Sequence, residues 1–202
     1  PVVRTDGMRG VAGEYPLDRP TCYALGVALA RWIGTEHLDP EIVIGMDTRE
    51  SGPWIAEHVA GGLDEGGVRA RFAGLITTPG LAHEARTGPF AAGVMISASH
   101  NPYLDNGLKI INHAGFKLPD EQEHLLELYM AEWAATGKVP APKLIEVDDG
   151  LDSAYLEHLA ATAPGGLGGL KVVIDASNGA ATHLAPALFR RLGAQVDSIH
   201  CS

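Results

Sequence analysis

Cysteine and long apolar runs are scarce in this sequence of 202 residues. The two cysteines, Cys22 and Cys201, lie far apart and form no CxxC pair, which argues against a disulfide framework and against a thiolate metal site. Such cysteine usage is typical of proteins of the reducing cytoplasm. No apolar run approaches the ~18 residues that a membrane-spanning helix needs, so we expect no membrane association.

Positive charge is also limited, because 15 lysine and arginine residues stand against 25 acidic residues and the formal net charge is -10. Affinity for nucleic acids comes mainly from lysine and arginine side chains that neutralise phosphates, so we expect no nucleic-acid partner. A small phosphate ester is a different matter. A few cations focused in a cleft can bind it inside an acidic protein.

Glycine and short apolar runs are, by contrast, abundant. A short apolar, β-branched run predicts a strand buried on both faces at residues 41–47, and further strands are expected at residues 68–73, 91–97 and 108–112. Helical spacing predicts helices at residues 21–33, 79–86 and 121–135, and one that starts at Ser51 as N-cap and stops at Gly66-Gly67. The fold class that we predict is α/β, as a three-layer α/β/α sandwich domain with a mixed, mostly parallel sheet.

A change in composition divides the chain. Residues 137–142 (GKVPAP) have the composition of a linker. A helix at residues 151–161 is expected to follow, and then one β-α-β unit with strands at 171–175 and 195–199 around a helix at 180–192. We therefore predict a first domain at residues 1–145 and the incomplete start of a second, similar domain at residues 146–202. The exposed strand edge at 195–199 invites pairing with a second copy, as in a homodimer.

Ser97-Ala98-Ser99-His100-Asn101-Pro102 is the most unusual segment, because it crowds polar side chains at the carboxyl end of a predicted strand, where open α/β sheets bind ligands. A polar turn is the simplest interpretation. A Ser-His hydrolase is disfavoured, since adjacent side chains on extended backbone point apart. A metal site is disfavoured by scattered histidines without HxH or HExxH spacing. A phosphoryl-carrying serine needs only an exposed hydroxyl, a divalent cation and positive charge nearby.

Cations near this segment are candidates for that charge. Asp105-Asn106-Gly107 predicts a hairpin turn that folds Lys109 back toward Ser99, where the lysine can act as general acid and base. Arg9 lies between two glycines in residues 5–10 (TDGMRG), which we expect to be a loop, and its planar fork can clamp a phosphate.

Asp47 and Arg49 follow another predicted strand. We expect them to pair with each other in preference to contacting a substrate directly.

Four motifs together resemble the α-D-phosphohexomutase family in their order and spacing: TDGMRG at residues 5–10, GMDTRESG at 45–52, SASHNP at 97–102 and DNGLK at 105–109. SASHNP and GFKLP at residues 115–119 are most similar to the phosphoglucosamine mutase branch. The resemblance implies that Ser99 is phosphorylated in the active enzyme and exchanges its phosphoryl group with a phosphosugar substrate. Glucosamine 6-phosphate and glucosamine 1-phosphate would interconvert through a sugar bisphosphate.

The same resemblance implies roles for the neighbouring residues. One Mg2+ ion would bind through the phosphate on Ser99. Lys109 would be the general acid and base, and Arg9 would support the transferring phosphoryl group. His100, Asn101, Asp47 and Arg49 would form the surrounding phosphoryl environment.

Two alternatives stay open: a phosphomannomutase or phosphoglucomutase of the same family, and a non-catalytic fragment that self-associates. The Asp-rich metal loop and the later domains of the family are not present in residues 1–202. We therefore predict that this chain alone has little or no mutase activity.

Overall fold

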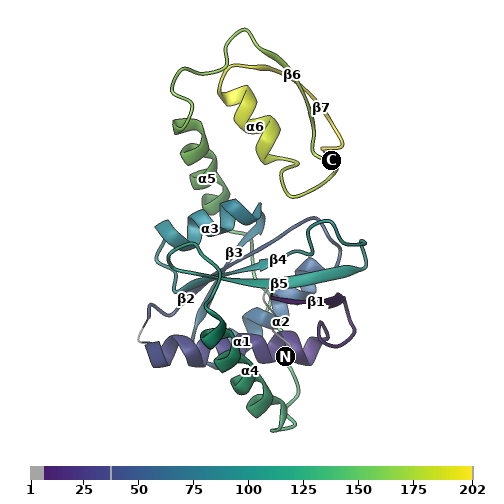
Figure 1. The fold of residues 1–202 in the computed structure, drawn as a ribbon, viewed down its shortest axis with the longest axis vertical. Coiled ribbons are helices and arrows are strands. Elements are labelled where there is room, and N and C mark those ends of the chain that lie inside the picture. The colour runs from purple at the N-terminus through teal and green to yellow at the C-terminus, as the bar shows by residue number, and fades with distance from the viewer. Residues whose placement is uncertain (1–6, 37, 202) are drawn as a thin grey trace.

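Two β-sheets organise residues 7–36 and 38–201, which the computed structural model describes (Figure 1). The larger sheet has the strand order β1-β5-β4-β2-β3. Its strands are β1 (Met8–Val11), β2 (Glu41–Met46), β3 (Arg69–Leu75), β4 (Ala92–Ile96) and β5 (Asp105–Asn112). Strand β2 is parallel to β3 and β4, and β5 is antiparallel to β4 and β1. Four strands therefore point one way and one points back, as a mixed, mostly parallel sheet.

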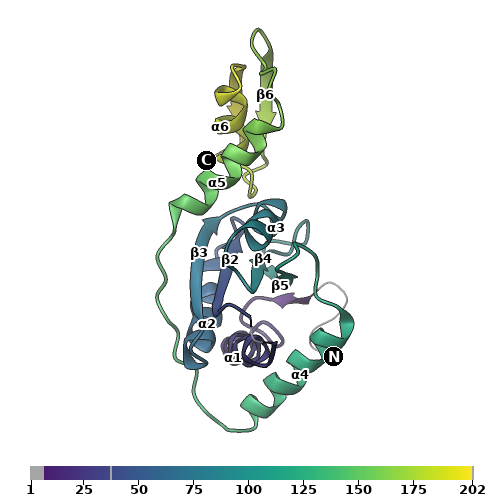
Figure 2. The same cartoon turned by 90° about the vertical axis from the view of Figure 1, so that its left-hand side faces the viewer.

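Helices cover both faces of this sheet (Figure 2). One face packs against α1 (Arg19–Glu36), α2 (Gly52–Glu65) and α4 (Asp120–Ala134), and the other against α3 (Thr78–Thr87) and α5 (Asp149–Ala161). Successive residues of a strand face opposite sides, so Ile42 and Ile44 join the first core and Val43 joins the second. The expected three-layer sandwich is confirmed.

Two local expectations at the sheet edge are wrong. Part of the predicted loop at residues 5–10 lies in a strand, Met8–Val11, which pairs with Asp105–Asn112. Thr5 and Asp6 of the same motif lie outside the described residues. The Asp-Asn-Gly segment is not a hairpin turn but the first part of β5, and residues 97–104 make the connection from β4 instead. Asn106 is fully buried and donates to Ser51 Oγ at 2.8 Å. Long-range pairing and burial thus override the local turn preference.

The C-terminal part holds the parallel strands β6 (Lys171–Asp175) and β7 (Gln195–Ile199) with α6 (Leu184–Arg191) between them. Helix α6 begins later than expected, because Pro186 lacks an amide hydrogen and fits only the first turn of a helix. Residues 138–146 form neither helix nor strand, as the linker composition predicts. The boundary between residues 145 and 146 stays a prediction.

Helix α5 packs against α3 and so anchors the linker to the larger sheet. The His158 ring stacks on the His83 ring at a centroid distance of 4.0 Å. The Tyr155 ring lies 5.6 Å from the same histidine. No helix in the described part of the chain is both long and apolar enough to cross a bilayer.

Glu84 of α3 makes this junction sensitive to pH. The residue is only 4% exposed, and burial raises the pKa of its carboxyl from 4.5 to about 7; Arg71 opposes the shift, and Asp152 and Asp148 add to it. A raised carboxyl pKa gives stability that is complete below pH 4.5 and is lost as the pH rises through about 7. We expect Glu84→Gln to remove roughly 1–3 kcal/mol of that pH dependence.

Urea unfolding of the wild type and of Glu84→Gln at pH 5 and at pH 8 measures the effect. Glu121→Gln is the matched control, since Glu121 is exposed on α4. Equal pH dependence in the wild type and Glu84→Gln would mean that Glu84 does not titrate in this range.

Candidate active site

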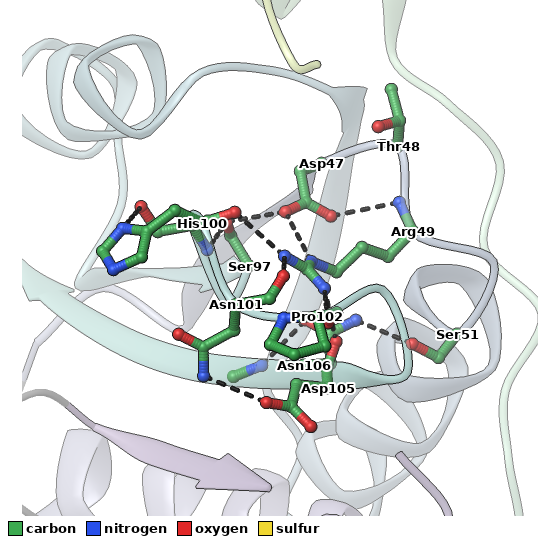
Figure 3. A network of polar contacts seen from close by, with 12 residues as sticks. Asp47, Thr48, Arg49, Ser51, Ser97, His100, Asn101, Pro102, Asp105 and Asn106 are labelled. Carbon is green, nitrogen blue, oxygen red and sulfur yellow. Dashed lines mark hydrogen bonds and ion pairs between the residues drawn. The ribbon is translucent and has the colours of Figure 1, made fainter. Parts of the chain in front are cut away.

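The serine loop, defined as residues 97–104, joins β4 to β5 (Figure 3). Ser99 lies at its turn. Ser99 has a φ of +56°, in the left-handed region that residues other than glycine seldom adopt. Both Ser99 and His100 are exposed to solvent. Backbone strain of this kind persists only where the surrounding contacts enforce it, and it is concentrated at functional sites.

The hydroxyl of Ser99 and the ring of His100 do not point apart, contrary to expectation. Ser99 Oγ lies 3.4 Å from His100 Nδ1, because the left-handed turn replaces the extended backbone on which that expectation rested. A serine hydrolase also needs a third group that orients the imidazole. Among residues 7–36 and 38–201, no such partner contacts the His100 ring.

Asp47 fixes the start of the serine loop. It follows β2 and is buried, and its Oδ2 accepts a hydrogen bond from Ser97 Oγ at 2.7 Å. Ser97 Oγ in turn accepts from the amide nitrogen of Ser99 at 3.1 Å. Arg49 Nε lies 3.2 Å from Asp47 Oδ2, so the expected Asp47–Arg49 pair is present. Ser97 thus links the Asp47–Arg49 pair to the backbone of Ser99, a role that the sequence did not indicate.

Arg49 holds the rest of the serine loop by its backbone (Figure 3). Its Nη1 donates to the carbonyl oxygens of Pro102 at 2.6 Å and Asp105 at 2.8 Å. Its Nη2 donates to those of Ser99 and Asn101, both at 2.9 Å. With Nε on Asp47, all five donors of the guanidinium are in use. Arg49 therefore shapes the loop and has no donor left for a ligand.

Asn101 closes the same loop from its other side. Its Nδ2 donates to Asp105 Oδ2 at 3.1 Å, and its amide nitrogen donates to the Ala98 carbonyl at 3.1 Å. Asn101 thus stabilises the turn through short-range contacts.

Arg9 reaches the serine loop across a glycine. It lies in β1 directly opposite Gly107 of β5, so its side chain shares a face of the sheet with that residue. A methyl group on Gly107 would lie 2.8 Å from the Ser97 carbonyl oxygen and 3.1 Å from Arg9 Cγ. Arg9 Nε is buried and has no hydrogen-bond partner among the residues that the structure describes. Arg9 thus packs beside Gly107, which neighbours the Ser97 carbonyl oxygen, and keeps an unused donor.

Gly107→Ala is expected to displace Arg9, the Ser97 carbonyl or both, because no real Cβ tolerates an oxygen at 2.8 Å. A shift of this kind in a positioned group is expected to lower any activity that depends on the serine loop, by roughly tenfold or more. Activity assays test it against Gly34→Ala in α1, where an added methyl group meets nothing within 4 Å. Equal activity of the two variants would contradict the tight packing at Gly107.

Lys109 lies in β5 opposite Met95, two residues beyond Gly107 and therefore on the same face as Arg9. A hairpin turn does not fold it back as expected, since its position follows from the strand itself. Lys109 lines a cleft of about 360 Å³ beside the start of α3, whereas Ser99 lines another. In the described residues its ammonium group has no ion pair or hydrogen bond.

Ser99 faces an open cleft of about 640 Å³. The far wall is the loop that follows β6, residues 177–180, which sequence reasoning did not assign to the site. Its signal was the Ser-Asn-Gly sequence at the carboxyl end of a parallel strand. The cleft is therefore built from both sheets.

A metal site is not assembled by the described residues alone: they contain no group of three histidine, cysteine, aspartate or glutamate side chains that could hold an ion. Asp47, the acidic residue nearest the loop start, is engaged by Ser97 and Arg49.

Comparison with known proteins finds relatives along almost the whole chain. Phosphoglucosamine mutase of Solibacter usitatus is 54% identical over 197 residues, which make up 98% of this chain and 44% of that protein. Phosphoglucosamine mutase of Koribacter versatilis is 40% identical over 206 residues, or 97% of this chain and 44% of that protein. This chain thus spans less than half the length of these curated relatives.

The fold also matches a solved structure of a phosphoglucomutase/phosphomannomutase family protein from Burkholderia thailandensis. The TM-score is 0.80 at 24% identity, and the match covers 100% of this chain and 44% of that one. The family model described as phosphoglucomutase/phosphomannomutase, alpha/beta/alpha domain I, matches residues 1–136. Since that match covers more than half of the chain, the chain belongs to the phosphoglucomutase/phosphomannomutase family.

Proposed function

We propose that the protein carrying residues 1–202 is a phosphohexomutase that interconverts glucosamine 6-phosphate and glucosamine 1-phosphate, with Ser99 as its phosphoryl carrier. One observation carries the proposal: an exposed hydroxyl on a left-handed turn whose backbone is clamped by Arg49 at four carbonyl oxygens. A serine whose backbone is held by this many hydrogen bonds suits a residue that must return to the same position in each half of a reaction. The names of the curated relatives support the choice of sugar.

Each half of the reaction is one phosphoryl transfer. In the first, the bond between phosphorus and Ser99 Oγ breaks, a bond to a sugar hydroxyl oxygen forms, and Ser99 Oγ takes up a proton from solvent. Lys109 accepts the proton of the sugar hydroxyl. In the second half the bond between the other phosphoryl group and its sugar oxygen breaks and a bond to Ser99 Oγ forms. Ser99 Oγ releases its proton to solvent, and Lys109 gives its proton back to the sugar oxygen.

Arg9 and Lys109 act on these transfers from the same face of the sheet. The unused Nε donor of Arg9 suits a phosphoryl oxygen, because charge-assisted hydrogen bonds to phosphate are stronger than neutral ones. The sugar would extend from the Ser99 cleft toward the cleft of Lys109. His100 and Asn101 act on the shape of the loop.

Mg2+ is the cofactor that we propose, and when bound it neutralises charge on the transferring phosphoryl group. Phosphorylated Ser99 would offer it an oxygen ligand, and further ligands would have to come from outside the described residues. We also propose that the substrate is a phosphosugar, that the protein forms a homodimer and that it resides in the cytoplasm.

Conversion of three substrates by the full-length gene product tests the proposal. With a trace of hexose 1,6-bisphosphate, 31P NMR would follow glucosamine 6-phosphate, mannose 6-phosphate and glucose 6-phosphate in parallel. We expect glucosamine 6-phosphate to have the highest kcat/KM, by about tenfold or more. Preferred conversion of mannose 6-phosphate or glucose 6-phosphate would assign the protein to the phosphomannomutase or phosphoglucomutase branch instead. Conversion of none of the three substrates would overturn the phosphohexomutase assignment.

A further inference from the structure

Thr48 stands between the two residues that hold the serine loop. Asp47 on one side binds Ser97, and Arg49 on the other binds the loop carbonyls. Thr48 itself is exposed, and its hydroxyl donates to the backbone carbonyl of Asn178 at 2.7 Å. This hydrogen bond joins the larger sheet directly to the C-terminal unit, which is built from β6, α6 and β7. It crosses the cleft that Ser99 lines.

The acceptor of that hydrogen bond is held in a fixed place. Ser177 and Asn178 both have left-handed backbones, with φ of +48° and +51°. Ser177 donates its amide to Asp175 Oδ1 at 2.9 Å, and Asn178 donates its amide to the His200 carbonyl at 2.7 Å. Two successive strained residues keep this shape only because neighbouring contacts enforce it. The loop therefore presents the Asn178 carbonyl as a rigid acceptor.

The contact adds little to the attachment of the two parts. Helix α5 already secures the C-terminal unit through the ring contacts of His83 with Tyr155 and His158. A single solvent-exposed hydrogen bond has a small net effect on folding. Thr48 is, by contrast, linked by peptide bonds to Asp47 and Arg49. A displacement of Thr48 therefore displaces both of these residues directly.

We propose that Thr48 is a positioning residue, which registers the serine loop against residues 177–180 and so sets the width of the cleft in front of Ser99. The inference rests on the proposed function of Ser99. Its chemistry requires both walls to stay in register, since a transfer step loses rate steeply when the reacting groups are misplaced.

Two variants of the full-length protein test this role. Thr48→Val keeps the branched shape and loses the donor, whereas Thr48→Ser keeps the donor. By hydrogen-deuterium exchange, we expect Thr48→Val to exchange roughly three- to tenfold faster than the wild type in residues 97–105 and 176–182. Its kcat should fall by a similar factor, with KM changed less than about twofold. Thr48→Ser should match the wild type in all of these measurements.

If residues 97–105 exchange as slowly in Thr48→Val as in the wild type, the positioning role is overturned. That conclusion holds even when Ser99 is phosphorylated and active. So would a Thr48→Ser variant that behaves like Thr48→Val, since the hydroxyl would then not be the group that acts. Failure of the proposed function is distinct: in that case the wild type itself takes up no phosphoryl group on Ser99, and the exchange measurements still decide whether Thr48 couples the two walls.

Discussion

Ser99→Ala is expected to abolish phosphoryl uptake from a hexose bisphosphate and to lower mutase kcat by roughly 10³-fold or more. The variant removes the one oxygen to which the phosphoryl group is proposed to bind. The loop should remain folded, because Asp47 and Arg49 hold it through Ser97 and through backbone carbonyls, not through Ser99 Oγ. Steady-state kinetics and intact mass of the variant measure both effects.

Ser153→Ala is the matched control for this substitution. Ser153 lies on α5, and its hydroxyl donates to the Asp149 carbonyl, away from the cleft. We expect the control to keep wild-type activity. Turnover of Ser99→Ala at a rate near that of the control would show that the phosphoryl group travels by another residue.

Arg49→Lys is expected to lower kcat by about 10²-fold, the second largest effect. Lysine carries three donors on a single nitrogen, so it cannot bind Asp47 and four separate carbonyl oxygens as the planar guanidinium does. Ser99, whose backbone is left-handed, would lose the hydrogen bond between its carbonyl oxygen and Arg49 Nη2. Charge is conserved in this variant, which isolates geometry as the cause.

Arg69→Lys separates this effect from a general intolerance of the chain to lysine. Arg69 of β3 has an exposed side chain that pairs with Glu41 at 3.2 Å, and surface pairs of this kind contribute little. We expect Arg69→Lys to retain full activity and normal exchange of residues 97–105. Arg49→Lys with wild-type kcat would contradict the clamping role of the guanidinium.

The sequence predicts the core elements of the fold well, because their signals are local. The runs that became β2 and β4 are mostly apolar and include β-branched residues, as is typical of strands buried on both faces. The glycine pair after Glu65 ends α2 where expected, and Gly67 takes a φ of +76°. Ser51 marks the start of that helix but does not cap it, since its hydroxyl binds Asn106 instead.

The site could be predicted only in part, because its geometry depends on partners far away in the chain. Ser99, Arg9 and Lys109 stand out by residue type and motif. The backbone of Ser99 and the clamp by Arg49 could not be foreseen, since the acceptors of Arg49 are carbonyl oxygens about fifty residues away, and any sequence supplies carbonyls. The pairing of Arg9 with Gly107 likewise arises only when β1 joins the sheet.

Phosphopeptide mass spectrometry of the full-length protein, after incubation with glucosamine 1,6-bisphosphate, tests the central claim most directly. The phosphohexomutase proposal predicts one phosphoryl group per chain, located on Ser99, and its loss when excess glucosamine 6-phosphate is added with Mg2+. A bare Ser99 under these conditions, or a phosphoryl group on another residue that is discharged by the sugar phosphate, would contradict it.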